Sequence, residues 1–358
     1  MTSAIACRVV DVPGKGKGLV ASRFLPRGSL IVSERPLIQL PRGFGVFSDI
    51  GEYASQPAVE KLMTFPGDPE SPFSSRTKHF LPMVGSDQYI SGLFEIICRA
   101  NHSCRPNANY YWNNVLGKEV LHAILDIEEG SEIEVNYVAD ERAGSDRRAY
   151  LESAFGFTCM CSACVRPFEE RMQVATRVRQ YLEFVEELPS WFGSKPPMWI
   201  LNKIEEYTIA ACKDGLLHDI AARCHDAFQL CAYYGDATHA AEWEAISRDE
   251  YTVRNGRDEP AAARARRLAA HPQEFRAWAQ LGRRKLKGPS DALKKWAYPK
   301  STAWPGSATA NAVVVTTTTT PATTPEQVSP PTNEVKLSKG QKKKLREKKK
   351  KVAGLSEV

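Results

Sequence analysis

Apolar and polar residues alternate with a period of two through much of the first part of the chain. Apolar side chains recur at every second position from Ile5 to Val9, and apolar alternation resumes from Leu19 to Val32 after the glycine-rich stretch 13–18. Because successive side chains of a strand point to opposite faces, this pattern predicts a strand, a glycine turn and further strands. Residues from about 42 to 90 lose the periodicity and gather Pro, Gly and Ser, which predicts an insert between two halves of one domain.

The same alternation returns in two later runs, 120–124 and 132–137. In the second run Ile133, Val135 and Tyr137 occupy one set of positions and polar residues occupy the other. Since a period of two places alternate residues on one face of a strand, we expect Tyr137 to point inward with its two β-branched neighbours. A core tyrosine whose hydroxyl bonds to the backbone is the alternative to a functional role at this position.

From Glu169 the period becomes helical. Apolar residues recur three or four positions apart in three stripes, and Gly215 and Gly235 end the second and third. The stripes comprise Val174, Val178, Tyr181, Leu182 and Val185, then Ile200, Ile204, Tyr207 and Ala211, then Ile220, Cys224, Phe228 and Cys231. A fourth helix is predicted around Trp243 and a fifth from Pro272 through Leu281. The pattern as a whole predicts a helical region of antiparallel hairpins.

Beyond about Lys300 the composition changes to Ser, Thr, Pro and Ala, and a lysine-rich run follows near the end of the sequence. Such a segment buries too little apolar area to offset its chain entropy, so residues 299–358 are predicted to be disordered. The lysine run suits a nuclear-import signal, a weak contact with polyanions or a solubilising tail.

The net charge of +6 is concentrated in this tail. Residues 336–351 hold ten Lys or Arg and one Glu, a local charge of +9, which leaves −3 for the rest of the chain. A slightly acidic body offers no basic surface to nucleic acid, so direct nucleic-acid binding is expected only weakly, through the tail. The same charge suits a basic, lysine-containing peptide as a partner.

Two further properties bear on the compartment. The chain is 42% hydrophobic, which is enough for a large core, and it has no run of 18 apolar residues to span a bilayer. Its first fifteen residues lack a basic region followed by a long apolar one, which argues against a secretory signal. We therefore expect no membrane association and a location in the nucleus, the cytoplasm or both.

Nine cysteines in an intracellular chain are interpreted as thiols or metal ligands before disulfides. Cys159, Cys161 and Cys164 lie within six residues of one another. Structural zinc takes four ligands in a tetrahedron, so a fourth ligand has to come from elsewhere in the chain. The candidate is Cys104, in the compact polar turn 101–107, and His102 of the same turn is the alternative.

Four segments of the sequence resemble the SET-domain protein lysine methyltransferases and occur in that family's order. They are Gly16-Lys17-Gly18-Leu19, Asn101-His102-Ser103-Cys104-Arg105-Pro106-Asn107, Glu132-Ile133-Glu134-Val135-Asn136-Tyr137 and Gly156-Phe157-Thr158-Cys159-Met160-Cys161-Ser162-Ala163-Cys164. The cysteine pattern is most similar to the SMYD-like branch and to related fungal SET proteins. The sequence departs from that branch because residues 8–97 contain no cysteine, which excludes a cysteine-rich MYND finger in the insert.

The resemblance implies an α+β fold divided along the chain. A β-rich SET domain of small sheets with a knot-like turn would occupy residues 1–140, with its insert at about 42–90. A post-SET zinc-binding segment would follow at 141–168. An all-α C-terminal domain at 169–298 and the disordered tail at 299–358 would complete the chain.

The resemblance also implies a protein-lysine N-methyltransferase that uses S-adenosyl-L-methionine, acts on a histone or non-histone protein and works as a monomer. Tyr137 would be the catalytic residue, and a structural Zn²⁺ would be held by cysteine. The implied cofactor contacts are Gly16, Lys17, Gly18, Asn101, His102, Tyr137 and Phe157, and the implied zinc ligands are Cys104, Cys159, Cys161 and Cys164. Taken singly, the glycine motif also fits a plain tight turn, and Phe157 also fits a packing contact. A non-catalytic SET-fold adaptor that binds a peptide is the alternative for the whole chain.

Overall fold

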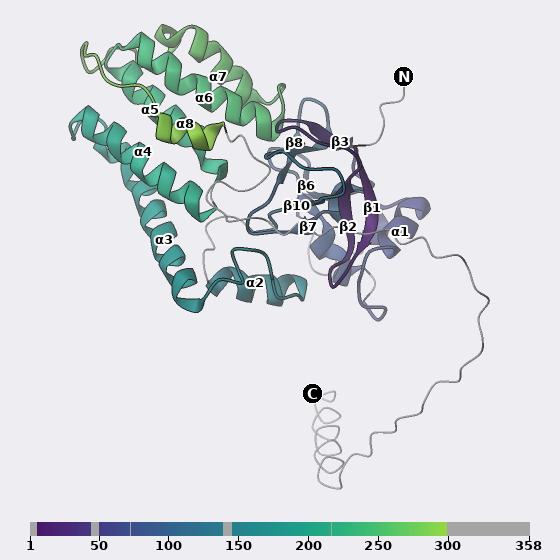
Figure 1. Cartoon of the computed structure of the whole chain (residues 1–358). Coiled ribbons are helices and arrows are strands. Elements are labelled where there is room, and N and C mark those ends of the chain that lie inside the picture. Colours follow the sequence, from purple (N-terminus) through teal and green to yellow (C-terminus); the bar gives the residue numbers. More distant parts are fainter. Residues whose placement is uncertain (1–5, 44–49, 72, 139–144, 216, 299–358) are drawn as a thin grey trace, which may run out of the picture. The chain divides into compact units, whose positions relative to one another are not determined.

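The computed structural model describes residues 6–43, 50–71, 73–138, 145–215 and 217–298 (Figure 1). The tail predicted to be disordered, residues 299–358, lies outside the described residues. Within the described part, strands gather in the N-terminal half and helices in the C-terminal half (Figure 1). This division matches the α+β fold that the hydrophobic patterns predict.

The first sheet brings together segments that are far apart in the sequence. Its order is β1–β2–β10–β7, formed by Cys7–Val12, Gly16–Ala21, Glu132–Val135 and Asn101–His102. A tight turn joins β1 to β2, and Gly14 and Gly16 adopt positive φ angles of 73° and 77° there, a conformation that glycine tolerates best. The pairing of β7 with β10 is parallel, whereas β2 is antiparallel to both of its neighbours. The turn that begins at Asn101 therefore lies directly beside the last strand.

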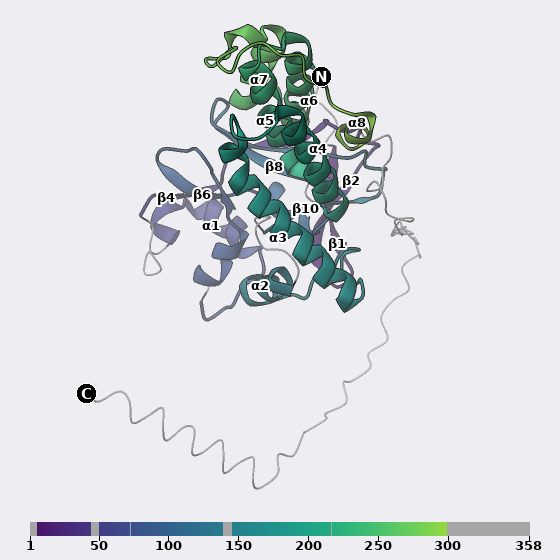
Figure 2. The same cartoon turned by 90° about the vertical axis from the view of Figure 1, so that its left-hand side faces the viewer.

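Two three-stranded sheets complete the β-rich part. One has the order β3–β9–β8, formed by Leu30–Glu34, Lys118–Ala123 and Ala108–Asn113. The other has the order β4–β6–β5, formed by Ile38–Pro41, Tyr89–Leu93 and Leu81–Pro82. The short helix α1 (Gln56–Met63) and the 3₁₀ turns Ile50–Tyr53 and Ser74–His79 lie between β4 and β5. Figure 2 shows α1 beside β4 and β6. Leu62 and Phe65 pack there with Ile38, Leu40 and Leu93 in a small separate core.

Seven helices follow the strands in the described chain. They are α2 (Ser145–Phe155), α3 (Phe168–Trp191), α4 (Pro197–Asp214), α5 (Ile220–Tyr233), α6 (Ala237–Asn255), α7 (Pro260–Ala270) and α8 (Asp291–Ala297). Two 3₁₀ turns, Leu217–Asp219 and Pro272–Glu274, lie among them, and a third, Ile97–Arg99, lies earlier, between β6 and β7. Helix α4 ends as predicted, because Gly215 adopts the left-handed conformation with a φ of 111°. Trp243, Tyr181 and Phe228 are fully buried in the core that these helices share.

The predicted fifth helix is wrong. Residues 272–274 form a single 3₁₀ turn, and the segment after it is held to the end of α5 by backbone bonds, such as the one from Ala279 N–H to the Ala232 carbonyl oxygen at 2.8 Å. Phe275 and Trp278 pack against the helical core from this irregular segment. Helix α7 lies earlier and was missed because its buried positions include Ala262 and Ala265, which are too small to give a clear apolar stripe.

The helical part contacts the β-rich part through polar interactions. An ion pair joins Arg27 to Glu250 of α6 at 2.5 Å, and both side chains are largely buried. Arg105, which follows Cys104, donates from Nη2 to the carbonyl oxygen of Lys213 at 2.9 Å, at the end of α4. Among the described helices, none has the length and apolar character needed to cross a bilayer.

Candidate active site

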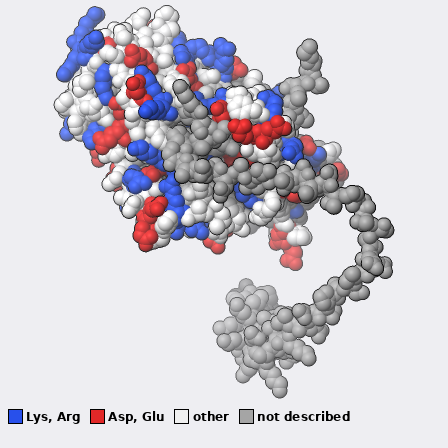
Figure 3. Space-filling model, in the orientation of Figure 1, with Lys and Arg blue, Asp and Glu red and all other residues white. Residues whose placement is uncertain are grey.

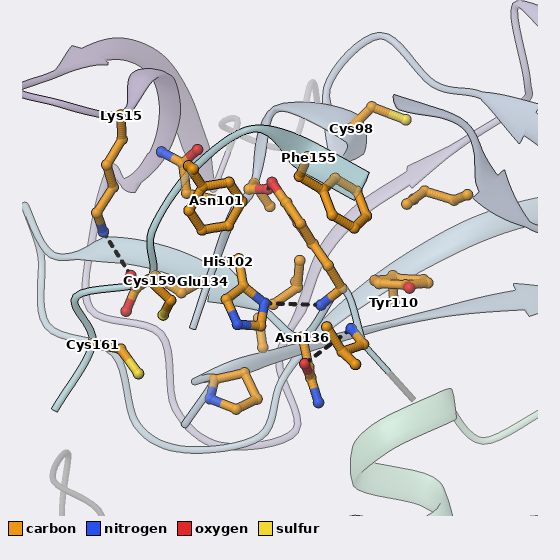
Figure 4. A pocket seen from close by; sticks show the side chains of 18 of the residues that line it. Lys15, Cys98, Asn101, His102, Tyr110, Glu134, Asn136, Phe155, Cys159 and Cys161 are labelled. Atoms are coloured by element: carbon orange, nitrogen blue, oxygen red, sulfur yellow. Dashed lines mark hydrogen bonds and ion pairs between the residues drawn. The ribbon is translucent and has the colours of Figure 1, made fainter. Parts of the chain in front are cut away.

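A cavity of about 930 Å³ lies where the Asn101 turn, β10 and the cysteine segment meet (Figure 4). Pockets of this size hold small-molecule ligands and cofactors in other proteins. Strands and turns of the β-rich part supply most of the lining, and the helical part adds Gly215, Leu217 and Arg254. In Figure 4, Lys15, Glu134, Cys159 and Cys161 lie toward one side of the cavity, and Tyr110 lies toward the other.

Asn107 fixes the Asn101 turn to β10. Its amide nitrogen donates to the carbonyl oxygen of Glu132 at 2.8 Å, and its amide oxygen accepts from the backbone N–H of Glu134 at 2.9 Å. Parallel pairing of Asn101 with Glu134 and of His102 with Val135 completes the junction. The side chains of Asn101 and His102 are therefore held by the main chain of the strand that ends just before Tyr137.

Tyr137 points into the protein as predicted, although it lies two residues beyond the end of β10. Its hydroxyl donates to the carbonyl oxygen of Ala100 at 2.6 Å. Burial raises the pKa of Tyr137 well above its ordinary value, so the phenol keeps its proton at neutral pH. With that proton committed to Ala100, the oxygen has only lone pairs to offer to a ligand in the cavity.

An aromatic cluster forms one wall of the cavity. The ring of Tyr137 lies 5.0 Å from that of Phe155 and 6.4 Å from that of Phe157, and Phe157 lies 6.0 Å from His102, measured between ring centroids. Phe157 both lines the cavity and packs with the cysteine segment, so the packing contact is present and the cofactor contact stays a prediction. Phe155 was not predicted as a site residue, and only the aromatic spacing in Phe155-Gly156-Phe157 hints at it.

The four predicted zinc ligands lie together. The sulfur atoms of Cys104, Cys159, Cys161 and Cys164 are all within 4.8 Å of one another. Tetrahedral zinc with Zn–S bonds of about 2.3 Å would place its sulfur ligands ~3.8 Å apart, close to this arrangement. Hydrogen bonding, first of all from Cys104, lowers the pKa of Cys159, which favours the thiolate that a metal requires. The donor set therefore fits a structural zinc ion.

His102 is not placed as a fourth metal ligand. Its Nδ1 accepts from the backbone N–H of Tyr137 at 3.0 Å, so the ring proton belongs on Nε2. Nε2 lies 3.3 Å from the sulfur of Cys104 and donates to it. His102 thus connects the backbone of Tyr137 to the cysteine cluster, which is a positioning role more than a metal-binding one.

The glycine motif is close to the cavity but does not line it. Among the described residues, the lining from this turn consists of Pro13, Gly14 and Lys15, whereas the ammonium of Lys17 is paired with Asp11 on the outside. Gly18 serves packing, because a Cβ there would lie 2.7 Å from Nδ2 of Asn101. The cofactor contacts of Gly16, Lys17 and Gly18 stay a prediction, and the residues of this turn that line the cavity are the three that precede them.

Lys15 is the functional candidate that sequence reasoning missed. Its ammonium lies 2.8 Å from carboxylate oxygens of both Glu132 and Glu134, and it lines the cavity. Glu132 also accepts from Nδ2 of Asn101 at 2.8 Å. Burial raises the pKa of Glu134 to about 7, and Lys15 opposes that rise. The group forms a polar end of the cavity.

The chain is also similar to known proteins. The SET domain family matches residues 16–138. A protein named histone-lysine N-methyltransferase set5, from Schizosaccharomyces pombe, is 29% identical over 242 residues, covering 65% of this chain and 74% of that protein. Histone-lysine N-methyltransferase Smyd1 of Mus musculus is 26% identical over 38% of this chain, and histone-lysine N-methyltransferase SMYD3 of Homo sapiens is 31% identical over 27% of it.

These matches differ in how much of each relative they cover. The chain spans 29% of Smyd1 and 24% of SMYD3, so it is comparable with them over less than a third of their length. The Set5 match extends over most of that protein. Residues 16–138 of the chain therefore match a SET domain, and the relatives named above are called histone-lysine N-methyltransferases.

Proposed function

We propose that this protein transfers a methyl group directly to the deprotonated side chain of a lysine in a protein substrate. The observation that carries the proposal is the position of Tyr137. Its ring lies in a cavity whose other walls carry Asn101, His102 and Phe157, which are the residues that the resemblance assigns to the cofactor. S-adenosyl-L-methionine, when bound, would supply an electrophilic methyl group on its sulfonium sulfur. As the bond between the lysine nitrogen and the methyl carbon forms, the bond from that carbon to sulfur breaks and the rest of the cofactor leaves as a neutral thioether.

The residues at the polar end of the cavity suit the methionine part of such a cofactor. Lys15 carries a positive charge that attracts a carboxylate, and Glu134 carries a carboxyl group that attracts an ammonium. Phe157 and Phe155 give flat apolar surfaces against which a purine can stack. These side chains come from three separate segments of sequence, and the β7–β10 pairing places Glu134 beside Asn101.

Tyr137 acts in this proposal by position and by its lone pairs, not as a base. Because the phenol remains protonated and donates to Ala100, its oxygen can accept a hydrogen bond from the substrate amine and aim the nitrogen lone pair. The amine loses its proton before transfer, since burial and a neighbouring positive charge both lower the pKa of an ammonium group.

The cysteine cluster supports the same cavity from outside. Cys159 and Cys161 line the cavity and also belong to the cluster that fits zinc. Zinc bound by the four sulfurs would tie residues 159–164 to the Asn101 turn and so fix Phe157 over the cavity. This zinc is structural, because all four of its positions are taken by protein sulfur.

The substrate is a protein or peptide that contains lysine. The named relatives are called histone-lysine N-methyltransferases, which makes histones the first substrates to test. We propose that the protein works as a monomer in the nucleus, the cytoplasm or both.

The test is a transfer assay with labelled cofactor and a mixture of histones and other lysine-rich proteins. The full chain should label at least one protein at lysine, and Tyr137→Phe should bind the cofactor but lose most of the turnover, because the ring remains and the hydroxyl does not. Cofactor binding without label transfer by the unaltered protein would favour the adaptor. Equal turnover by Tyr137→Phe would remove the hydroxyl from the mechanism.

A further inference from the structure

A strongly basic stretch of surface lies on the helical part of the protein. Between Arg264 and Lys285 the chain has seven cationic residues and one acidic residue, Glu274. All seven cationic side chains are exposed. We refer to these residues as the arginine cluster; they are Arg264, Arg266, Arg267, Arg276, Arg283, Arg284 and Lys285.

Most of this charge is not compensated within the protein. Arg267 lies 3.5 Å from a carboxylate oxygen of Glu274. The other six side chains have no carboxylate within ion-pair distance in the part of the chain that the structure describes. Figure 3 shows blue side chains gathered over the end of the protein where Figure 1 places α7 and the segment after it. Such a concentration of one sign attracts a polyanion.

The backbone that carries the second half of the cluster is anchored. The N–H groups of Leu281 and Arg284 donate to the carbonyl oxygens of Tyr233 and Tyr234, each at 2.9 Å. The buried Leu286 then donates its N–H to a carboxylate oxygen of Asp236 at 2.6 Å. These bonds fix the segment to the end of α5, so a ligand would not have to order the chain on binding.

The cluster suits a phosphate chain better than an acidic protein. Protein interfaces rely on apolar anchors, and between residues 264 and 285 the only exposed large apolar side chain is Leu281. Interfaces with nucleic acid are far more positively charged, and guanidinium groups match phosphate oxygens in pairs. Six of the seven members are arginine.

We propose that the arginine cluster binds the phosphate backbone of duplex nucleic acid, without regard to base sequence. None of its members lines the active-site cavity, so this binding is separate from methyl transfer. It would hold the protein on a nucleic acid that also carries the protein substrate.

The test uses the full chain and a fluorescently labelled DNA duplex of random sequence, with anisotropy measured over a series of salt concentrations. In the cluster variant, Arg264, Arg276, Arg283 and Arg284 are all changed to Gln. Each phosphate contact contributes about −0.9 to the slope of log K against log salt, so the loss of four contacts should make the slope shallower by about 3.6. The dissociation constant in low salt should rise at least ~10-fold for the loss of several phosphate contacts.

The matched control changes four lysines of the tail, Lys342, Lys343, Lys344 and Lys348, to Gln and so removes the same charge. If the control loses the binding while the cluster variant keeps the slope and affinity of the unaltered protein, the proposal is overturned. It is also overturned if polyglutamate of equal charge displaces the labelled duplex as well as unlabelled duplex does, since the partner is then an acidic protein. Thermal melts followed by circular dichroism check that each variant is folded. If the fourfold variant is unfolded, the double variant Arg283→Gln and Arg284→Gln replaces it, because both residues lie on an irregular segment.

Discussion

Glu119 is the most unusual buried group in the β-rich part, and it gives the protein a predictable response to pH. Its side chain is fully buried, and neither carboxylate oxygen has a hydrogen-bond partner among the described residues. Burial, followed by the negative charge of Glu34 directly across the β3–β9 pair, raises the pKa of Glu119 from 4.5 to about 9. Glu34 instead accepts hydrogen bonds from the backbone N–H groups of Ile96 and Ile97. Glu119 is therefore the protonated member of the pair at neutral pH.

The raised pKa is a cost to stability at neutral pH. Below pH 4.5 the carboxyl of Glu119 is protonated in both the folded and the unfolded states, so the free energy of unfolding has its full value there. Between pH 4.5 and about 9 only the unfolded state ionises, so the free energy of unfolding falls by about 1.4 kcal/mol per pH unit. At pH 7 the accumulated loss from this group is about 3 kcal/mol.

The perturbation that isolates this effect is Glu119→Gln, which has the same shape and no charge in either state. A buried amide adds its own unsatisfied donors, which costs about 1–3 kcal/mol at every pH, so the slope is the informative quantity and not the absolute difference. We expect the unaltered protein to lose stability relative to the variant by about 1.4 kcal/mol per pH unit from pH 5 to pH 8.

Urea unfolding of both proteins at unit intervals of pH measures this slope. Tryptophan fluorescence is a suitable signal, because Trp112 lies opposite Glu119 in the β8–β9 pair. Other groups that titrate in this range, such as Glu134, are present in both proteins and cancel in the difference. A difference that stays constant between pH 5 and pH 8 would show that Glu119 is ionised in the folded protein and would refute the reasoning.

Three shorter predictions concern the site and its support. Gly18→Ala should destabilise the protein by about 1–3 kcal/mol in thermal unfolding and weaken cofactor binding in calorimetry, because the new Cβ would collide with Asn101. Metal analysis should find about one zinc per chain and none in Cys104→Ser, whereas an unchanged zinc content would make His102 the fourth ligand. Arg27→Ala should cost about 3–5 kcal/mol in urea unfolding by stranding the buried Glu250, and equal stability would show that the pair is solvated.

Half of the strands and half of the helices in the described chain follow from periodicity, namely β1–β3, β9, β10 and α3–α6, because each of these elements buries one face and its sequence records that burial. The exceptions show the limit of this signal. Val9 is 44% exposed although it shares one face of the edge strand β1 with the buried Cys7. Phe275 and Trp278 are three positions apart, as on one face of a helix, but they lie in an irregular segment after the 3₁₀ turn 272–274. Both side chains pack against the helical core, and their spacing records that burial and not a helical backbone. Spacing therefore identifies buried side chains more reliably than it identifies the backbone that carries them.

The candidate site could be predicted only where neighbouring residues share a role. The cysteine spacing indicated three zinc ligands, and the need for a fourth led to Cys104 sixty positions away from Cys164. By contrast, Lys15 and Phe155 gave no comparable signal, since a lysine in a turn and a phenylalanine at the end of a helix are common on any surface. Their roles depend on the parallel pairing of β7 with β10, which no local pattern encodes.

The charge distribution shows why a net value can mislead. Subtracting the tail left a body of −3, and this sum implied that the body has no basic surface. Yet residues 264–285 alone contribute +6, and their side chains are exposed while several acids elsewhere, including Glu119, Glu244 and Glu250, are buried. A partner meets only the exposed charges within about one Debye length, ~8 Å at physiological salt, so the local surface decides what binds. A neutral or acidic total is therefore compatible with a strongly basic docking site.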